Sequence, residues 1–184
     1  LERLDRSNRP EDEIRIIREI GESGRSVAQR ELLPYLRSPR FDVRMEALLA
    51  LENIRSLNRT SLQAVAETMR EHPFTTAYLS ARILGKNDYR ESIPLLREAL
   101  GSKDYMLKGA AMVALAQLKD TPTVPLMEEI VASAGNPCII VQGAYALEIL
   151  GSATSVPPLV EVLRKEGTPD IVRDEAVLSL AAIL

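Results

Sequence analysis

Residues 42–54 read D-V-R-M-E-A-L-L-A-L-E-N-I, and this stretch decides the fold. Its apolar residues fall at helical spacing on one face, namely Val43, Ala47, Ala50, Leu51 and Ile54. The small side chains of Ala47 and Ala50 in the middle of that face allow a neighbouring helix to approach closely. The stretch therefore predicts an amphipathic helix that packs tightly against another helix.

The same pattern returns downstream in four further segments. Their equivalent positions are Leu51, Ala81, Leu115, Leu147 and Leu180, which are separated by 30, 34, 32 and 33 residues. A repeat of this length in helical segments is typical of an array of helical repeats. Each repeat cannot cover its own apolar face, so neighbouring repeats must stack.

A second helix type precedes each copy of this pattern and, in four of the five, carries proline at one fixed point; Ala64 takes that place in the remaining one. The dipeptides are Leu33-Pro34, Ile93-Pro94, Val124-Pro125 and Val156-Pro157. Proline fits the first turn of a helix because its missing N–H would have no helical partner there. Glycine or proline stands at nearly every junction between segments. The repeat is therefore predicted to contain two helices and two short turns, and no segment predicts a strand.

The two helix types together resemble the HEAT repeat, and most closely its bacterial, phycobilisome-lyase-like subtype. The motif is carried best by residues 42–44 (D-V-R) and 170–173 (D-I-V-R), whereas the repeat at 138–151 lacks the charged pair and the one at Thr75 is degenerate. The resemblance implies an all-α fold, an α-α superhelix. This is a right-handed solenoid of antiparallel helix pairs, with about five HEAT-like repeats and partial ends. It further implies that the Pro-bearing helices line the convex side and the Val-Arg helices the concave side.

Residues 1–184 are predicted to form a single solenoid, with residues 1–10 as a linker or helix end. We expect the chain to be a piece of a longer protein. Glycine at the end of a periodic segment is a helix-stop signal, which predicts helix ends at Gly21 and Gly85. The aspartates that open the repeated pattern are predicted helix N-caps. They are Asp42, Asp104 and Asp170.

Composition argues against several classes of function. The net charge is −3 and there is no Trp, which disfavours a nucleic-acid partner. One cysteine (Cys138) and one histidine (His72) exclude an internal disulfide and a Cys/His zinc site. No run of 18 apolar residues predicts a membrane span within this segment. We therefore expect no metal, no cofactor and no catalytic residue, and we predict a cytoplasmic protein, free or tethered to a membrane region outside this segment, that is not an enzyme. The resemblance to the bacterial subtype implies a bacterial protein.

One row of residues in the repeated pattern has two interpretations. Two positions before Leu51 and its equivalents, every repeat has an apolar residue, namely Leu49, Leu79, Val113, Tyr145 and Leu178. The row either packs sideways against neighbouring helices, or forms an exposed stripe that grips a partner helix or peptide. In the second interpretation Met45, Thr75 and Val141 extend the stripe, and Glu52, Arg82 and Glu148 supply polar specificity at its rim.

The leading hypothesis is a non-catalytic scaffold that binds another protein or peptide through the concave face of the solenoid. Such arrays expose extended surfaces that suit this role. One alternative is a soluble regulatory domain of a larger, transporter-like membrane protein, because the Arg-rich start suits the cytoplasmic side of a preceding span. Another alternative is a chromophore-lyase-like protein, which follows from the repeat subtype alone. The sequence leaves the partner, the pathway and the oligomeric state open.

Overall fold

The computed structural model describes residues 10–23, 28–74 and 76–184, and every regular element in this part of the chain is a helix. The predicted all-α fold class is confirmed. The α-helices are α1 (Pro10–Glu22), α2 (Ala28–Leu32), α3 (Phe41–Asn53), α4 (Arg59–Glu71), α5 (Ala77–Lys86), α6 (Ile93–Ala99), α7 (Tyr105–Gln117), α8 (Val124–Ser133), α9 (Pro137–Leu150), α10 (Val156–Arg164) and α11 (Asp170–Ile183). Residues 1–9, which hold most of the predicted linker, and Thr75 of the predicted stripe lie outside the described residues.

Four short 3₁₀ helices accompany the Pro-bearing helices. They are η1 (Leu33–Arg37), η2 (Arg90–Ser92), η3 (Thr121–Thr123) and η4 (Ala153–Ser155). The last three lead directly into α6, α8 and α10, and proline occupies the first turn of each of these α-helices. We call the Pro-bearing helices, together with α4, the first helices of the repeats. The helices with the Asp42–Ile54 pattern (α3, α5, α7, α9 and α11) are the second helices.

The chain divides into two compact units, Leu1–Ile83 and Leu84–Leu184. In unit 1, α1 packs against α3, and η1 packs against both α3 and α4. The predicted apolar face of α3 is buried along its whole length, from Val43 to Ile54. The spacing of apolar residues therefore predicted the buried face of this helix correctly. The single solenoid over residues 1–184 stays a prediction.

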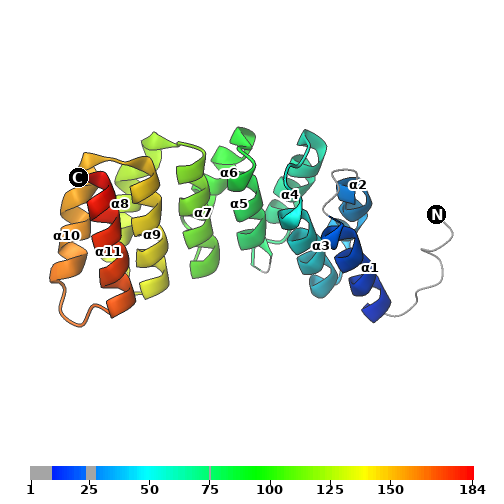
Figure 1. Cartoon of the computed structure of the whole chain (residues 1–184), viewed down its shortest axis with the longest axis horizontal. Helices are drawn as coiled ribbons and strands as arrows, with labels where there is room; N and C mark the ends of the chain where they lie inside the picture. The colour runs from blue at the N-terminus through cyan, green and yellow to red at the C-terminus, as the bar shows by residue number, and fades with distance from the viewer. Residues whose placement is uncertain (1–9, 24–27, 75) are drawn as a thin grey trace. The chain divides into compact units, whose positions relative to one another are not determined.

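In unit 2, the second helices α7, α9 and α11 lie side by side; the first helix α8 lies behind them, and α10 lies beside α11 at the end of the row (Figure 1). Helix α9 packs against both α7 and α11, and each first helix packs against the second helix that follows it. The predicted core positions of α7 are all buried, from Leu107 to Leu118. Each repeat covers the apolar face of its neighbour, as a stacked array requires.

Gly21 and Gly85 do not end their helices, and this prediction is wrong. Both lie inside helices, at points where a second helix comes very close. A Cβ atom on Gly21 would lie 2.7 Å from the Cβ of Ala50, and one on Gly85 would lie 2.6 Å from the Cα of Ala114. Glycine is required here by helix packing and not by the backbone angles of a helix end.

Left-handed backbone conformations follow three of the second helices. Gly151 (φ 62°) comes directly after α9, whereas Asp88 (φ 51°) lies two residues after the end of α5 and Lys119 (φ 57°) two residues after the end of α7. Glycine adopts this conformation without cost, and a side chain makes it unfavourable. Only the end of α9 therefore has the residue type that a helix-stop pattern recognises.

Of the three predicted N-caps, only Asp104 is one. Its carboxylate accepts hydrogen bonds from the backbone N–H of Met106 (2.8 Å) and of Leu107 (3.4 Å). Asp42 and Asp170 lie inside the first turn, and the N-cap positions belong to Arg40 and Pro169. Both helices therefore begin one or two residues before the start that an aspartate N-cap would predict.

Candidate functional site

The unit 1 part of the predicted stripe is largely packed between helices. Met45 and Leu49 on α3 are half-buried. Leu79 on α5 is only 2% exposed, so its place in an exposed stripe is corrected: it is a core residue. The sideways-packing interpretation applies to this position, because a helix within an array is contacted on more than one side.

The two predicted rim residues of unit 1 bind one another. A guanidinium nitrogen (Nη2) of Arg82 on α5 lies 2.9 Å from a carboxylate oxygen (Oε1) of Glu52 on α3. These residues stand at equivalent positions, one after Leu51 and one after Ala81. The glutamate of one second helix is thus neutralised by an arginine of the next.

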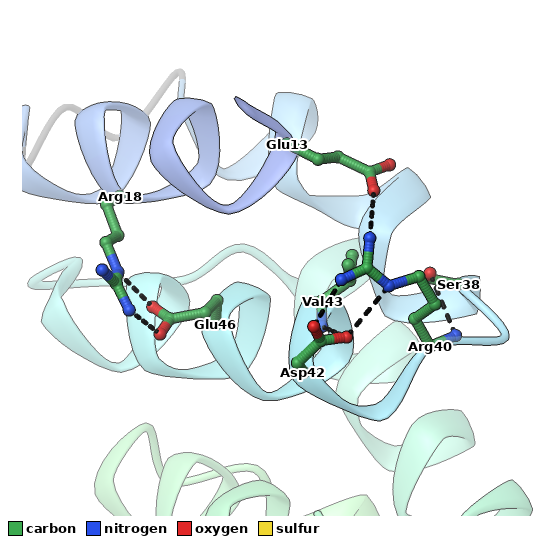
Figure 2. A network of polar contacts seen from close by, with 7 residues as sticks. All are labelled: Glu13, Arg18, Ser38, Arg40, Asp42, Val43 and Glu46. Atoms are coloured by element: carbon green, nitrogen blue, oxygen red, sulfur yellow. Dashed lines mark hydrogen bonds and ion pairs between the residues drawn. The ribbon is translucent and has the colours of Figure 1, made fainter. Parts of the chain in front are cut away.

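A second ion pair joins α1 to α3 in the same manner. Arg18 donates two hydrogen bonds to Glu46, from Nε at 3.1 Å and from Nη2 at 2.5 Å (Figure 2). The hydrogen bonds to Glu46 raise the pKa of Arg18. The pair lines a hollow of about 100 Å³ that also includes Leu49 and Gly21. Leu49 is therefore bordered by a paired arginine and glutamate.

Arg40 forms a separate network at the start of α3 (Figure 2). Its guanidinium binds the carboxylate of Asp42 and lies 3.7 Å from Glu13 of α1. The hydrogen bond from Arg40 is the main reason that the pKa of Asp42 is lowered. This network positions α3 relative to α1. The carboxylate of Asp42 pairs with Arg40, two residues before it, and not with an arginine of the next repeat.

The arginines of the Asp-Val-Arg motif form hydrogen bonds with the turns that precede their helices. Arg44 is buried, and its Nη1 donates to the carbonyl of Ser38 at 2.7 Å. Arg173 donates through Nε to the carbonyl of Thr168 at 3.1 Å. In both repeats the arginine bonds the backbone of the preceding turn. The motif therefore has a structural role at these two sites.

The unit 2 part of the stripe is more exposed. Val113 on α7 and Val141 on α9 are half-buried, whereas Tyr145 on α9 is 44% exposed and Leu178 on α11 is 62% exposed. Because α9 and α11 pack together, the two exposed side chains belong to neighbouring helices. Large apolar side chains gathered on one surface are typical of interaction sites.

Two glutamates accompany this exposed part of the stripe. Glu148 on α9 accepts a hydrogen bond of 3.5 Å from the hydroxyl of Ser179 on α11. Burial raises the pKa of Glu175 on α11, and the negative charge of Glu148 raises it further. Among the described residues neither glutamate forms an ion pair. The sequence analysis missed Glu175, although its helical spacing from Ile171 and Leu178 could have indicated it.

We define the α9–α11 surface by two sets of residues with the same helical spacing. Within each set the positions are i, i+4 and i+7, so the three residues share one helix face. The set on α9 is Val141, Tyr145 and Glu148, and the set on α11 is Ile171, Glu175 and Leu178. Ile171 is 65% exposed.

A larger cleft, which the sequence analysis did not predict, lies between η1 and α4 in unit 1. Its volume is about 580 Å³, and its walls include Leu33, Pro34 and Arg37 on one side and Gln63 and Glu67 on the other. Arg37 and Glu67 approach to 3.8 Å across it. The cleft lies on the first helices, away from the residues of the predicted stripe.

Neither a metal site nor a membrane span emerges from the described part of the chain. No three side chains of His, Cys, Asp or Glu gather there as metal ligands would. None of the helices described combines the length and the apolar character needed to cross a bilayer. Cys138 is exposed near the start of α9, where its N–H bonds the side chain of Asn136.

Comparison with known proteins supports the repeat type. Residues 65–140 match the model of a family described as HEAT repeats. This confirms the resemblance predicted from the aliphatic-Pro and Asp-Val-Arg motifs. A search of curated protein sequences found no match.

Solved structures with this fold include the complex of CpcE and CpcF of phycocyanin lyase from Nostoc sp. PCC7120. The superposition has a TM-score of 0.53 and 18% sequence identity, and it covers 91% of this chain and 72% of the other. At this identity the likeness concerns the fold. It corrects the prediction that the chain is not an enzyme, because a HEAT-like chain of this fold is part of a lyase.

Proposed function

We propose that this chain binds another protein through the second helices of unit 2, with Tyr145 and Leu178 as the main contacts. The observation that carries the proposal is the exposure of these two large side chains on adjacent helices, 44% and 62% respectively. Tyrosine is enriched at the energetic centres of interfaces, because it combines a large apolar area with a hydroxyl group. HEAT arrays offer such rows of side chains on a rigid scaffold.

The unit 1 half of the row suits a different role. Leu79 is buried, and Glu52 and Arg82 already satisfy one another. A partner that displaced the Glu52–Arg82 pair would have to replace its interaction. We therefore propose that unit 1 supports the array and that the contact surface is centred on α9 and α11.

The test compares a double variant with a matched control. Tyr145→Ser with Leu178→Ser removes the proposed contacts, while Leu126→Ser removes an apolar side chain of similar exposure (43%) on the first helix α8. Each protein is used to capture partners from a lysate of the source organism, and the captured proteins are quantified by mass spectrometry. We expect one partner to be retained by the wild type and the control and lost by the double variant. Equal capture by all three proteins would contradict the proposal.

A second candidate is a role in a lyase-type complex, which the fold of the phycocyanin lyase complex favours. In this case the protein bound by the α9–α11 surface would be a second lyase subunit or the chromophore-bearing protein. The chain is incubated with phycocyanin, and the visible absorption of the chromophore is followed over time. A spectral change that requires the chain supports this candidate, and an unchanged spectrum in the presence of the captured partner contradicts it.

A further inference from the structure

We propose that the α9–α11 surface takes an amphipathic helix of a partner protein that carries an arginine beside its apolar residues. This inference rests on the proposed function and adds the chemistry of the partner. The apolar part of the contact is Tyr145, Ile171 and Leu178, and the polar part is Glu148 and Glu175.

Unit 1 shows how this chain satisfies glutamates on its second helices. Glu46 of α3 receives two hydrogen bonds from Arg18 of α1, and Glu52 of α3 pairs with Arg82 of α5. In both pairs the arginine comes from the adjacent helix. Arginine suits this task because its planar guanidinium can donate two parallel hydrogen bonds to a carboxylate.

Unit 2 has the equivalent glutamate, but the next second helix has no arginine at the equivalent position. Glu148 directly follows Leu147, as Glu52 follows Leu51, so the two glutamates are equivalent in the repeat. The residue of α11 that corresponds to Arg82 is Ala181, which directly follows Leu180 and is exposed. The guanidinium that closes the pair in unit 1 is thus replaced by a methyl group in unit 2.

The second glutamate strengthens the demand for a cation. Glu175 is partly removed from water, and the negative charge of Glu148 on the neighbouring helix acts on it in addition. Like charges in such a setting are stabilised by a nearby positive group. Within the described part of the chain, Glu148 has only the hydroxyl of Ser179 as a hydrogen-bond donor, at 3.5 Å. A cation from a partner would relieve this repulsion.

The geometry favours a helix over an extended peptide as the occupant. The surface lies on two packed helices, and its residues follow the spacing i, i+4 and i+7 on each of them. An amphipathic helix presents its own apolar side chains at the same spacing and can carry a charged residue one turn further on. Charge complementarity also excludes a phosphate-rich or otherwise anionic occupant.

The experiment selects helical peptides from a displayed library. Each peptide has a fixed helix-forming background with leucine at two positions one turn apart, and one position on the same face is randomised. Selection against the whole chain is expected to enrich arginine, and to a smaller extent lysine, at the randomised position. Binding of the selected peptide, measured by fluorescence anisotropy, should weaken about tenfold in the Glu148→Gln, Glu175→Gln variant and should weaken with added salt.

Controls separate this inference from the proposed function. Glu161→Gln and Glu166→Gln remove two exposed carboxylates elsewhere in unit 2 and should leave the affinity unchanged. If the peptides bind, require Tyr145 and Leu178, but show no preference for a basic residue and no loss with Glu148→Gln, Glu175→Gln, the inference is wrong and the proposed function stands. If no helical peptide binds the chain, or binding survives Tyr145→Ser with Leu178→Ser, both are wrong.

Discussion

Single glycines set the distance between neighbouring helices at two contacts. Gly85 lies so close to Ala114 that any side chain would meet backbone at 2.6 Å. The sequence pattern predicted that helices end at Gly21 and Gly85, because glycine after an apolar stretch is a common helix-stop signal. The contact partner stands 29 residues further on in each case, Ala50 for Gly21 and Ala114 for Gly85. A local pattern cannot reveal such a contact.

Gly85→Ala should destabilise the protein, although alanine is the better helix former. Intrinsic propensity alone would favour alanine by about 1 kcal/mol. Overpacking against Ala114 should cost about 1–3 kcal/mol, so we expect a net loss of stability in urea denaturation. Gly135→Ala is the control, because no atom lies within 4 Å of a Cβ built there. A stabilised Gly85→Ala protein would contradict the close approach of the two helices.

Lys119→Gly should raise the stability by about 1 kcal/mol, because it removes an unfavourable left-handed conformation. Gly151→Ala at the equivalent end of α9 should lower the stability by a similar amount. Lys119 also donates a hydrogen bond from Nζ to the carbonyl of Ile149 at 2.9 Å, so Lys119→Met serves to measure the loss of that bond alone. Thermal unfolding of the three variants gives the comparison; a lower melting temperature for Lys119→Gly than for Lys119→Met would show the interpretation to be wrong.

At the scale of helices and turns, one ion pair joins α6 to the turn after α7. Arg97 donates to both carboxylate oxygens of Asp120, from Nε at 2.9 Å and from Nη2 at 2.6 Å. Asp120 is buried and also accepts a hydrogen bond from the hydroxyl of Thr123. These bonds, with that from Arg97 the largest cause, lower the pKa of Asp120. The turn before α8 is thereby fixed to the preceding repeat.

The stability of the protein should therefore depend on pH through Asp120. Its pKa is lower in the folded than in the unfolded chain, so its contribution is fully present above the unfolded value of about 3.9 and is lost as the pH falls through the folded value. Asp120→Asn should cost about 1–2 kcal/mol at pH 7, because Arg97 remains half-exposed and water partly replaces the lost bonds. The difference between wild type and Asp120→Asn, measured by urea denaturation, should shrink below pH 4. A difference that stays constant down to pH 2.5 would show that Asp120 has no such role.

The helical segments and their buried faces were predicted well at this scale, whereas several helix ends were not. All five repeats of the Asp42–Ile54 pattern are helices, and their Leu/Ala faces are mostly buried. These features follow from spacing within about a dozen residues, which a sequence displays directly. Two of the three N-caps were predicted wrongly. Arg40 and Pro169 occupy the N-cap positions, and the aspartates that were predicted there lie in the first turn of the helix.

At the scale of the whole molecule, the prediction of one solenoid over residues 1–184 can be tested by cooperativity. Leu51 in unit 1 and Leu147 in unit 2 are both fully buried. If the repeats form one stacked array, Leu51→Ala and Leu147→Ala should each lower the midpoint of the same single transition, by about 2–5 kcal/mol in stability. Chemical denaturation followed by circular dichroism and by hydrogen exchange distinguishes the cases. Two separate transitions, each sensitive to only one variant, would mean that the units fold independently.

The amino-acid sequence by itself determined the helical repeat, the buried faces of the second helices and the position of the Pro-bearing helices. These depend on the order of apolar and small residues within one helix, together with a period of about 32 residues. Only the tertiary structure decided that Leu79 is buried while Tyr145 and Leu178 are exposed, although all three occupy the same position of the repeat. It also decided that Glu52 pairs with Arg82, whereas Glu148 accepts a hydrogen bond from Ser179 and has no ion pair among the described residues. The physical reason is that exposure and charge pairing depend on the side chains that the next repeat brings alongside, about thirty residues away.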